Sequence, residues 1–549
     1  MTLSTQPPAS QAALIAALMQ QLASCGQSVQ CFETHISWVL VAGDYAYKIK
    51  KAVTMDFLDC STLAARRYFC EEELRLNRRL SPNLYLDVVK VAGDAARPCL
   101  NGAGEAIDYA VRMHAFAQTA VWRQRLAGGQ LSMQEVDALA DRLARFHQAA
   151  ATATAASARG EPEGLGAGVD TTITALVRLA GDHASQAALA RLHAWDATQR
   201  LQLAPVFAKR KRAGMVRECH GDLHTGNILT TARGVEVFDC IEFSDALRWI
   251  DVIDDLAFAC MDLACRGRCD LAVRLLNGYL ALTGDYGGLV LLAYYSVRRA
   301  LVRCLVLLLR AAQAAPSAVA DASRSEALAY LAFASRLATP GKPAILITHG
   351  CSGSGKTRFA QGAAARLGAV HLRSDIERKR MHGLEPGDRS GALPGSLLYG
   401  AAATDHTYTR LLLLTRMVVR AGMVALVDAA FLAPTQRQRF ARYAVRSGIP
   451  FFIFDVRASP AKMVQRLAMR ASAGTDASDA DVTVLAQQLA NVQPLSAWEM
   501  KRALVVDTED GLSPAAVADL CKPLEAILGG PWQGIAEQPG CAFPGNSGT

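Results

Sequence analysis

Residues 345–357 read ILITHGCSGSGKT, and this stretch decides the fold of the C-terminal part of the 549-residue chain. An apolar run comes first, a glycine-rich turn follows, and Lys356 and Thr357 open a helical pattern. The spacing G-x-x-x-x-G-K-T between a strand and a helix lets successive backbone N–H groups converge on phosphate oxygens at the helix N-terminus. The sequence therefore predicts a phosphate-binding loop in an α/β domain.

The residues of this loop have predicted roles in holding a nucleoside triphosphate. The predicted nucleotide-binding set is Gly350, Gly353, Ser354, Gly355, Lys356 and Thr357. Lys356 is expected to reach the β- and γ-phosphates, and the Thr357 hydroxyl to ligate Mg²⁺. A later apolar run, residues 423–427, ends in Asp428, which we expect on the same ion; an aspartate that only caps a helix is the alternative. ATP and Mg²⁺ are the expected cofactors.

Short apolar runs alternate with longer helical patterns beyond residue 341. The expected strands are residues 344–348, 369–372, 423–427, 450–454 and 504–506. Such alternation is typical of βαβ units. The sequence predicts an α/β P-loop domain with a parallel five-stranded sheet over residues 341–528, followed by a disordered tail over residues 529–549.

A possible acceptor site follows the second of these strands. Asp375 and Arg378 stand three residues apart, and this arrangement resembles P-loop kinases that phosphorylate hydroxyls, including polynucleotide 5′-kinases, gluconate-type kinases and zeta-toxin-like kinases. The resemblance implies that Asp375 accepts the hydroxyl proton and that Arg378 holds acceptor or phosphate; helix capping is the alternative. Arg466 and Arg470 share one helix face and are expected in a lid over the transferring group; solvated surface arginines are the alternative.

A second constellation lies in the first half, where residues 220–227 read HGDLHTGN and a short strand then leads to Asp239. Asp222 and Asn227 in one loop, with Asp239 beyond a hairpin, can supply a hydroxyl base and two Mg²⁺ ligands. The loop resembles that of the aminoglycoside phosphotransferase and choline kinase-like family. The resemblance implies that Asp222 is the catalytic base and that Asn227 and Asp239 bind metal.

Such a kinase also needs a lysine on a strand, paired with a glutamate on a helix. Lys48 and Lys50 share one face of the predicted strand, and we favour Lys48 as the phosphate lysine. Glu73 is the favoured partner, with Glu72 as the alternative. The usual glycine-rich covering loop is not evident before Lys48. Four aspartates follow the catalytic loop and are expected in part to cap helices or fix that loop: Asp251, Asp254, Asp255 and Asp262.

The first half begins with extended segments and becomes mainly helical after residue 121. We therefore expect an α+β protein-kinase-like bilobal domain over residues 1–335, with a small lobe at about 30–120 and a large lobe at about 121–335. The helix-breaking segment 339–343 marks the expected domain boundary. The apolar stretch 289–309 contains three arginines, so it predicts a buried helix and no membrane anchor.

Amino-acid composition and net charge exclude few classes of function. Half the residues are apolar, a fifth are charged, and the net charge of +8 is compatible with nucleotide phosphates or a polyanionic substrate. The N-terminus does not read as a signal peptide, and the cysteines are scattered through apolar stretches. A cytoplasmic protein with reduced thiols is therefore expected. The sequence leaves the oligomeric state open.

Together the two halves resemble the bifunctional aminoglycoside phosphotransferase/ATP-binding proteins. The resemblance implies an ATP-dependent kinase with two nucleotide-binding modules, each transferring a γ-phosphoryl group to the hydroxyl of a small molecule. Two alternatives stay open for the second module: a regulatory ATPase or nucleotide switch, and a kinase acting on nucleic-acid ends, which we do not favour. The sequence does not name the acceptor of either module.

Overall fold

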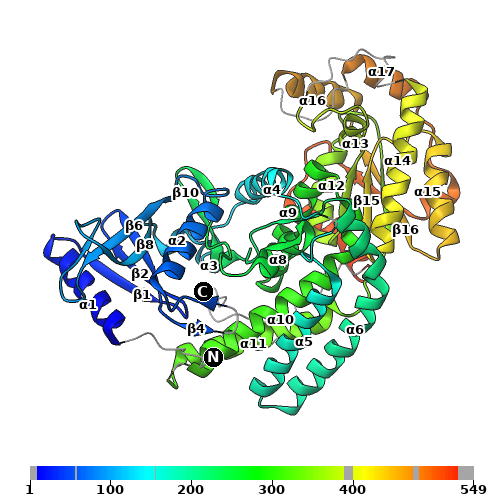
Figure 1. Ribbon diagram of the computed structural model, residues 1–549. Helices are drawn as coiled ribbons and strands as arrows, with labels where there is room; N and C mark the ends of the chain where they lie inside the picture. The colour runs from blue at the N-terminus through cyan, green and yellow to red at the C-terminus, as the bar shows by residue number, and fades with distance from the viewer. Residues whose placement is uncertain are drawn as a thin grey trace. The chain divides into compact units, whose positions relative to one another are not determined.

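The computed structural model shows a chain that packs into two compact units, which are described one at a time (Figure 1). The first unit comprises Met1–Gly166 and Ala204–Ala259, and the second comprises Ala167–Leu203 and Cys260–Thr549. The described residues are 9–55, 58–154, 156–313, 315–388, 400–473 and 481–528. The boundary expected near residue 340 separates the two predicted domains, which are not the same division as the two compact units, and it stays a prediction. The tail expected over residues 529–549 lies outside the described residues.

A six-stranded antiparallel sheet, in the order β1-β2-β3-β8-β6-β7, dominates the first part of the first unit. Its strands are β1 (Val29–Glu33), β2 (Ser37–Ala42), β3 (Tyr45–Lys50), β6 (Tyr85–Gly93), β7 (Pro98–Leu100) and β8 (Ala106–His114). Helix α1 (Ala9–Ser24) covers one face and helix α2 (Leu63–Asn77) the other (Figure 1). Alternation along β3 directs Ile49 toward α1, and Lys48 and Lys50 toward α2.

The rest of this unit combines helices with short strand pairs. Its elements are β4 (Thr54–Met55), β5 (Leu58–Asp59), α3 (Trp122–Ala127), α4 (Met133–Ala149), β9 (Val216–Glu218), β10 (Ile228–Thr231), β11 (Gly234–Val237), α7 (Asp245–Arg248) and β12 (Trp249–Asp251). Ser132 and Glu135 form a capping box that starts α4. Strand β9 pairs with β12, and β10 pairs with β11, so the loop between β9 and β10 is held from both sides. The predicted α+β kinase-like fold is confirmed.

The second unit contains a parallel sheet of five strands in the order β14-β15-β13-β16-β17, as the sequence predicts. Its strands are β13 (Ile345–His349), β14 (Val370–Arg373), β15 (Ala425–Asp428), β16 (Phe451–Arg457) and β17 (Ala503–Asp507). All five residues of β13 are buried, because helices cover both faces of the sheet. Phe359 of α12 (Lys356–Leu367) meets Phe454 of β16 edge to face in this core.

Helices make up the rest of the second unit. Those after the first strand are α13 (Ser374–Met381), α14 (Ala401–Arg420), α15 (Pro434–Arg446), α16 (Pro460–Ala473), α17 (Val482–Asn491), α18 (Ala497–Met500) and α19 (Pro514–Glu525). Those before it are α9 (Cys269–Thr283), α10 (Leu289–Gln313) and α11 (Ala318–Leu337), and α5 (Pro162–Leu179), α6 (His183–Arg212) and α8 (Val252–Cys265) include residues of both units. Across the described ranges, no helix has the length and apolar character needed to span a bilayer.

One buried arginine stabilises the second unit, and its removal gives the first prediction. Arg437 is fully buried, binds Glu499 with 2.7 Å between Nε and Oε1, and donates to the carbonyls of Phe431 and Pro494. Arg437→Met leaves Glu499 buried without its counter-charge, so we expect a loss of about 3–5 kcal/mol in unfolding free energy. Urea unfolding of the full chain measures it.

The matched control is Arg439→Met, because Arg439 pairs with Asp405 at the surface and 42% of its side chain is exposed. We expect a change within about 1 kcal/mol for this surface pair. Equal unfolding midpoints for the two variants would show that the buried pair contributes no more to the unfolding free energy than the surface pair does.

Candidate active sites

Two lysines of β3 and one glutamate of α2 form a buried charged cluster in the first unit. Glu73 accepts hydrogen bonds from Lys48 at 2.8 Å and from Lys50 at 2.5 Å, and its side chain is completely buried. Burial alone would raise the pKa of Glu73, but the two ammonium groups outweigh burial and lower it to about 2. The carboxylate therefore stays ionised.

The two lysines differ in their second partners. Lys48 Nζ lies 2.5 Å from Asp239 Oδ1, and 10% of its side chain is exposed. Lys50 is fully buried and binds Glu242. The sequence pattern did not predict this contact. Glu72, the alternative partner, instead binds Arg75. This geometry favours Lys48 and Glu73 as the nucleotide-positioning pair, and their roles stay predictions.

The predicted catalytic loop lies between β9 and β10. Asn227 donates from Nδ2 to the Asp222 carboxylate at 2.9 Å and to the Asp222 backbone carbonyl at 3.0 Å. Gly221 has a φ of 85°, and a Cβ there would lie 2.6 Å from the Leu247 carbonyl oxygen. Only glycine fits before Asp222, because that approach leaves no room for a side chain. The loop thus brings the predicted base and one predicted metal ligand together.

Asp239, the second predicted metal ligand, follows the β10–β11 hairpin. Its φ is 63°, a left-handed conformation that costs a non-glycine residue about 1–2 kcal/mol. The Tyr85 hydroxyl accepts a hydrogen bond from its backbone N–H at 3.2 Å. The side chain is 45% exposed while it contacts Lys48, so the carboxylate stands at the edge of the charged cluster.

Buried groups behind the loop fix its backbone. Asp255 accepts from the backbone N–H groups of His220 at 3.0 Å and Gly221 at 2.9 Å, and it contacts His147 Nε2 at 3.1 Å. Burial lowers the pKa of His220, so the ring is neutral, donating from Nε2 to the Phe238 carbonyl and accepting at Nδ1 from Asp222 N–H. Asp255 thus fixes the catalytic loop, as was expected for some of the four aspartates.

In the second unit, the glycine-rich loop joins β13 to α12. Gly350 has a φ of 144°, and a Cβ there would lie 2.4 Å from the Val456 carbonyl oxygen. Lys356 Nζ donates to the Cys351 carbonyl at 2.7 Å, so the lysine lies back over the loop. The Ser354 hydroxyl is buried and has no hydrogen-bond partner in the described part of the chain. This arrangement suits the binding of anionic oxygens, because the loop offers backbone N–H groups, the Lys356 ammonium group and the Ser354 hydroxyl.

Asp428 ends β15 directly beside the loop strand. His371 of β14 contacts it, with 3.2 Å between Nε2 and Oδ2. Burial alone would raise the pKa of Asp428, but His371, Arg373 and Lys356 outweigh burial and lower it to about 2. Asp428 is therefore an ionised carboxylate, and the sequence did not indicate its histidine partner.

The predicted lid residues are only partly described. Arg466 of α16 donates to the Gly353 carbonyl at 3.3 Å and to the Thr508 hydroxyl at 3.0 Å, so it contacts the loop from the side. Gln488 of α17 accepts from the Ser352 backbone N–H at 2.6 Å. Arg470 belongs to α16, but its side chain lies outside the described residues.

Asp375 and Arg378 both lie on α13, at the carboxyl end of β14, and both are partly exposed. Buried Glu377, between them in sequence, contacts Arg410 at 3.1 Å and also pairs with Arg380. Glu377 therefore anchors the helix, while the two predicted acceptor residues keep access to solvent. Their proposed roles are not tested by this geometry.

Comparison with known proteins identifies both halves. The profile of the Phosphotransferase enzyme family matches residues 60–292, and the profile of an AAA domain matches residues 345–495. The chain joins a phosphotransferase-family domain to an AAA domain. The predicted pairing of modules is confirmed, and the two family matches support a phosphotransferase of the kinase type joined to a P-loop domain of an ATP-binding family.

Several relatives and solved structures are similar to parts of the chain. Uncharacterized proteins of Mycobacterium tuberculosis and Mycobacterium bovis are 29% identical over 464 residues, or 84% of this chain and 90% of theirs. A choline/ethanolamine kinase family protein from Mesorhizobium loti is 14% identical, covering 60% of this chain and 98% of its own, with a TM-score of 0.34. A gluconokinase from Sinorhizobium meliloti 1021 is 18% identical, covering 34% and 95%, with a TM-score of 0.23.

The last part of the phosphotransferase match packs against the AAA domain within the second unit. Asn277 of α9 donates to the Ala369 carbonyl at 2.9 Å and accepts from the His371 N–H at 2.8 Å. Arg380 of α13 donates to the carbonyls of Leu280 and Ala281 at the end of α9. Helix α9 therefore holds β14, whose His371 contacts Asp428. Sequence patterns do not mark Asn277, because its partners are backbone groups.

Loss of this contact gives the second prediction. Asn277→Asp keeps the side-chain shape but removes the donor to the Ala369 carbonyl and places an anion against it. We expect a loss of about 1–3 kcal/mol in unfolding free energy and weaker nucleotide binding by the AAA domain. Thermal unfolding and ATP titration of the full chain measure the two effects. The opposite exchange on the same helix, Asp270→Asn, affects a partly exposed pair with Arg268 and should leave the unfolding free energy and nucleotide binding nearly unchanged.

The third prediction concerns acid sensitivity. Glu218 binds Arg75 at 2.8 Å, Arg79 at 3.1 Å and Arg248 at 3.2 Å. Burial alone would raise its pKa, but the arginines outweigh burial and lower the pKa from 4.5 to about 2. This pairing stabilises the fold fully above pH 4.5, and its contribution is lost as the pH falls toward 2, because the unfolded chain takes up the proton first.

Glu218→Gln should therefore unfold more easily at pH 7 and lose less of its remaining stability between pH 4.5 and 2 than the unchanged protein does. Urea unfolding at several pH values across this range measures how the unfolding free energy of each protein changes with pH. Parallel curves for the two proteins would exclude Glu218 as the titrating group.

Proposed function

We propose that both domains bind Mg-ATP and that each transfers the γ-phosphoryl group to a hydroxyl of a small-molecule acceptor. The observation that carries this proposal is that each unit separately places a carboxylate near the ammonium group of a lysine. In the first unit these are Asp239 and Lys48, and in the second Asp428 and Lys356.

The residues present fit a magnesium-bound triphosphate. Carboxylate and amide oxygens suit Mg²⁺, and Asn227 and Asp239 offer them in the phosphotransferase domain, as Asp428 and the Thr357 hydroxyl do in the AAA domain. The left-handed glycines of the loop leave a cradle without side chains, and the Ser354 hydroxyl is an available donor within it. Bound there, Mg-ATP supplies an activated phosphoryl group whose negative charge the ion partly neutralises.

In the phosphotransferase domain, Asp222 is the proposed base for the acceptor hydroxyl. The Asn227 amide donates to it at 2.9 Å, which orients the carboxylate. Lys48 is proposed to bind the α- and β-phosphates, and Glu73 keeps it ionised and in place. Burial alone would lower the pKa of Lys48, but Asp239 and Glu73 raise it well above its ordinary value, so it is a cation at neutral pH.

In the AAA domain, Asp375 is the proposed base and Arg378 the proposed acceptor or phosphate contact. Lys356 is released from the Cys351 carbonyl when it binds phosphate oxygens, and Arg466 and Arg470 are proposed to neutralise charge on the transferring group. A hydroxyl base is not needed in a simple nucleotide switch. Asp375 and Arg378 follow β14 at the carboxyl edge of the parallel sheet, the edge at which the glycine-rich loop follows β13, and this is our reason to prefer a kinase.

Isotope transfer provides the fourth prediction. The full chain is incubated with γ-labelled ATP and a panel of aminoglycosides, amino alcohols, sugar acids and oligonucleotides. Asp222→Asn should slow labelling of one acceptor class by about 10²- to 10⁴-fold, because it removes a positioned base, and Lys356→Ala should abolish labelling of the other.

Asp519→Asn and Lys522→Ala are the matched controls, because this pair is exposed on α19, and they should change neither rate. ATP hydrolysis that depends on Lys356 without any labelled acceptor would identify the AAA domain as a switch. Labelling of oligonucleotide ends would identify it as a nucleic-acid kinase. Undiminished labelling by the Asp222→Asn variant would exclude Asp222 as the catalytic base.

A further inference from the structure

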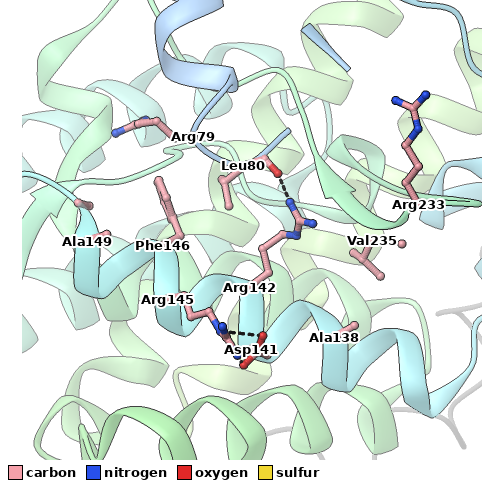
Figure 2. Close-up of a pocket in the computed structure, with 12 residues that line it drawn as sticks. Arg79, Leu80, Ala138, Asp141, Arg142, Arg145, Phe146, Ala149, Arg233 and Val235 are labelled. Atoms are coloured by element: carbon pink, nitrogen blue, oxygen red, sulfur yellow. Dashed lines mark hydrogen bonds and ion pairs between the residues drawn. The ribbon is translucent and has the colours of Figure 1, made fainter. Parts of the chain in front are cut away.

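A pocket of about 630 Å³ lies in the first unit among α4, the end of α2 and the β10–β11 hairpin (Figure 2). None of the residues that line it belongs to the candidate active sites described above. Its volume is within the range typical of small-molecule sites.

The walls carry an excess of positive charge. Four arginines and one aspartate line the pocket, a formal excess of three positive charges: Arg79, Arg142, Arg145, Arg233 and Asp141. Arg145 and Asp141 pair at the surface, where 78% of the arginine side chain is exposed, so this pair is largely screened. The charges that matter lie on the other three arginines.

Those three arginines differ in what they already bind. Arg79 is committed to the fold, because it binds Glu218 and the Cys219 carbonyl and stacks over Phe146 at 5.0 Å. Within the described residues, the Arg142 side chain donates to the Leu80 carbonyl, and the Arg233 side chain donates to the Asn83 carbonyl at 3.4 Å. Neither has a carboxylate partner among the residues that the structure describes. Their charges are therefore available to a ligand.

Part of the lining is apolar. Leu80, Phe146 and Val235 line the pocket together with Arg142, and the lining also includes Ala138, Ala149 and Ala150 (Figure 2). A planar guanidinium binds phosphate through two parallel hydrogen bonds, and an apolar floor accepts a hydrocarbon group. We propose that this pocket binds a small phosphate monoester, with its phosphate on Arg142 and Arg233 and its apolar part against Leu80 and Phe146.

The wall of the pocket is continuous with the candidate catalytic loop. Arg79 donates to the backbone carbonyls of Glu218 and Cys219, directly before His220, and Val235 lies on the strand that leads to Asp239. A ligand in this pocket thus contacts the strand that leads to Asp239, and it reaches the segment before Asp222 through Arg79. The proposal does not depend on the acceptor or cofactor of either domain.

Hydrogen–deuterium exchange of the full chain with phenyl phosphate tests the proposal. We expect slower exchange in peptides covering Met133–Ala149 and the β10–β11 hairpin, with an affinity at least about 10-fold above those of inorganic phosphate and of phenol. Peptides covering residues 350–357 report binding at the P-loop separately. Lys356→Ala should abolish protection there and keep it at the pocket.

Arg142→Gln and Arg233→Gln should each weaken protection of the pocket by about 10-fold, and Arg233 is exposed, so its replacement leaves the fold intact. Arg67→Gln is the matched control, because Arg67 pairs with Glu71 on the surface of α2. Absence of protection at saturating phenyl phosphate, or equal protection in the Arg233→Gln variant, overturns the site. Equal affinity for inorganic phosphate overturns the ligand class.

Discussion

The pairing of Glu73 with two lysines is the interaction on which the first unit depends. A charge buried without a partner costs several kcal/mol, so β3 and α2 can pack together only with Glu73, Lys48 and Lys50 in mutual contact. The same cluster extends to Asp239 through Lys48 and to Glu242 through Lys50. These ion pairs therefore hold β3, α2 and the segment after the β10–β11 hairpin in fixed positions. The candidate site is held by the same contacts that pack the unit together.

The second unit also holds a buried carboxylate in its ionised form, through His371, Arg373 and Lys356. His371 contacts the Asp428 carboxylate, and Asn277 holds His371 through its backbone N–H. Arg380 donates to the carbonyls of Leu280 and Ala281 in the last turn of α9, and the Leu280 carbonyl also accepts from the Gly284 backbone N–H. The contacts between α9 and the AAA domain are therefore specific hydrogen bonds to backbone atoms as well as apolar packing.

Much of this architecture could be predicted from short patterns. The glycine-rich loop and the apolar runs defined the parallel sheet, because a strand buried on both faces has few polar residues. The HGD loop and Asn227 indicated the other domain, because their spacing places them in one turn. Alternation could not separate Lys48 from Lys50, since both face α2; only their second partners distinguish them. Asn277, Glu242 and His371 were not predictable, because their partners lie far away in sequence.

The position of β14 has a consequence for the AAA domain as a separate protein. This strand is at the margin of the sheet, and Asn277 occupies a donor and an acceptor of its outer edge. An uncovered edge strand offers a template for another chain to pair with. A fragment that begins at residue 341 would expose this edge, so excision favours self-association and precipitation of the fragment. Helix α9 therefore protects the sheet against intermolecular pairing.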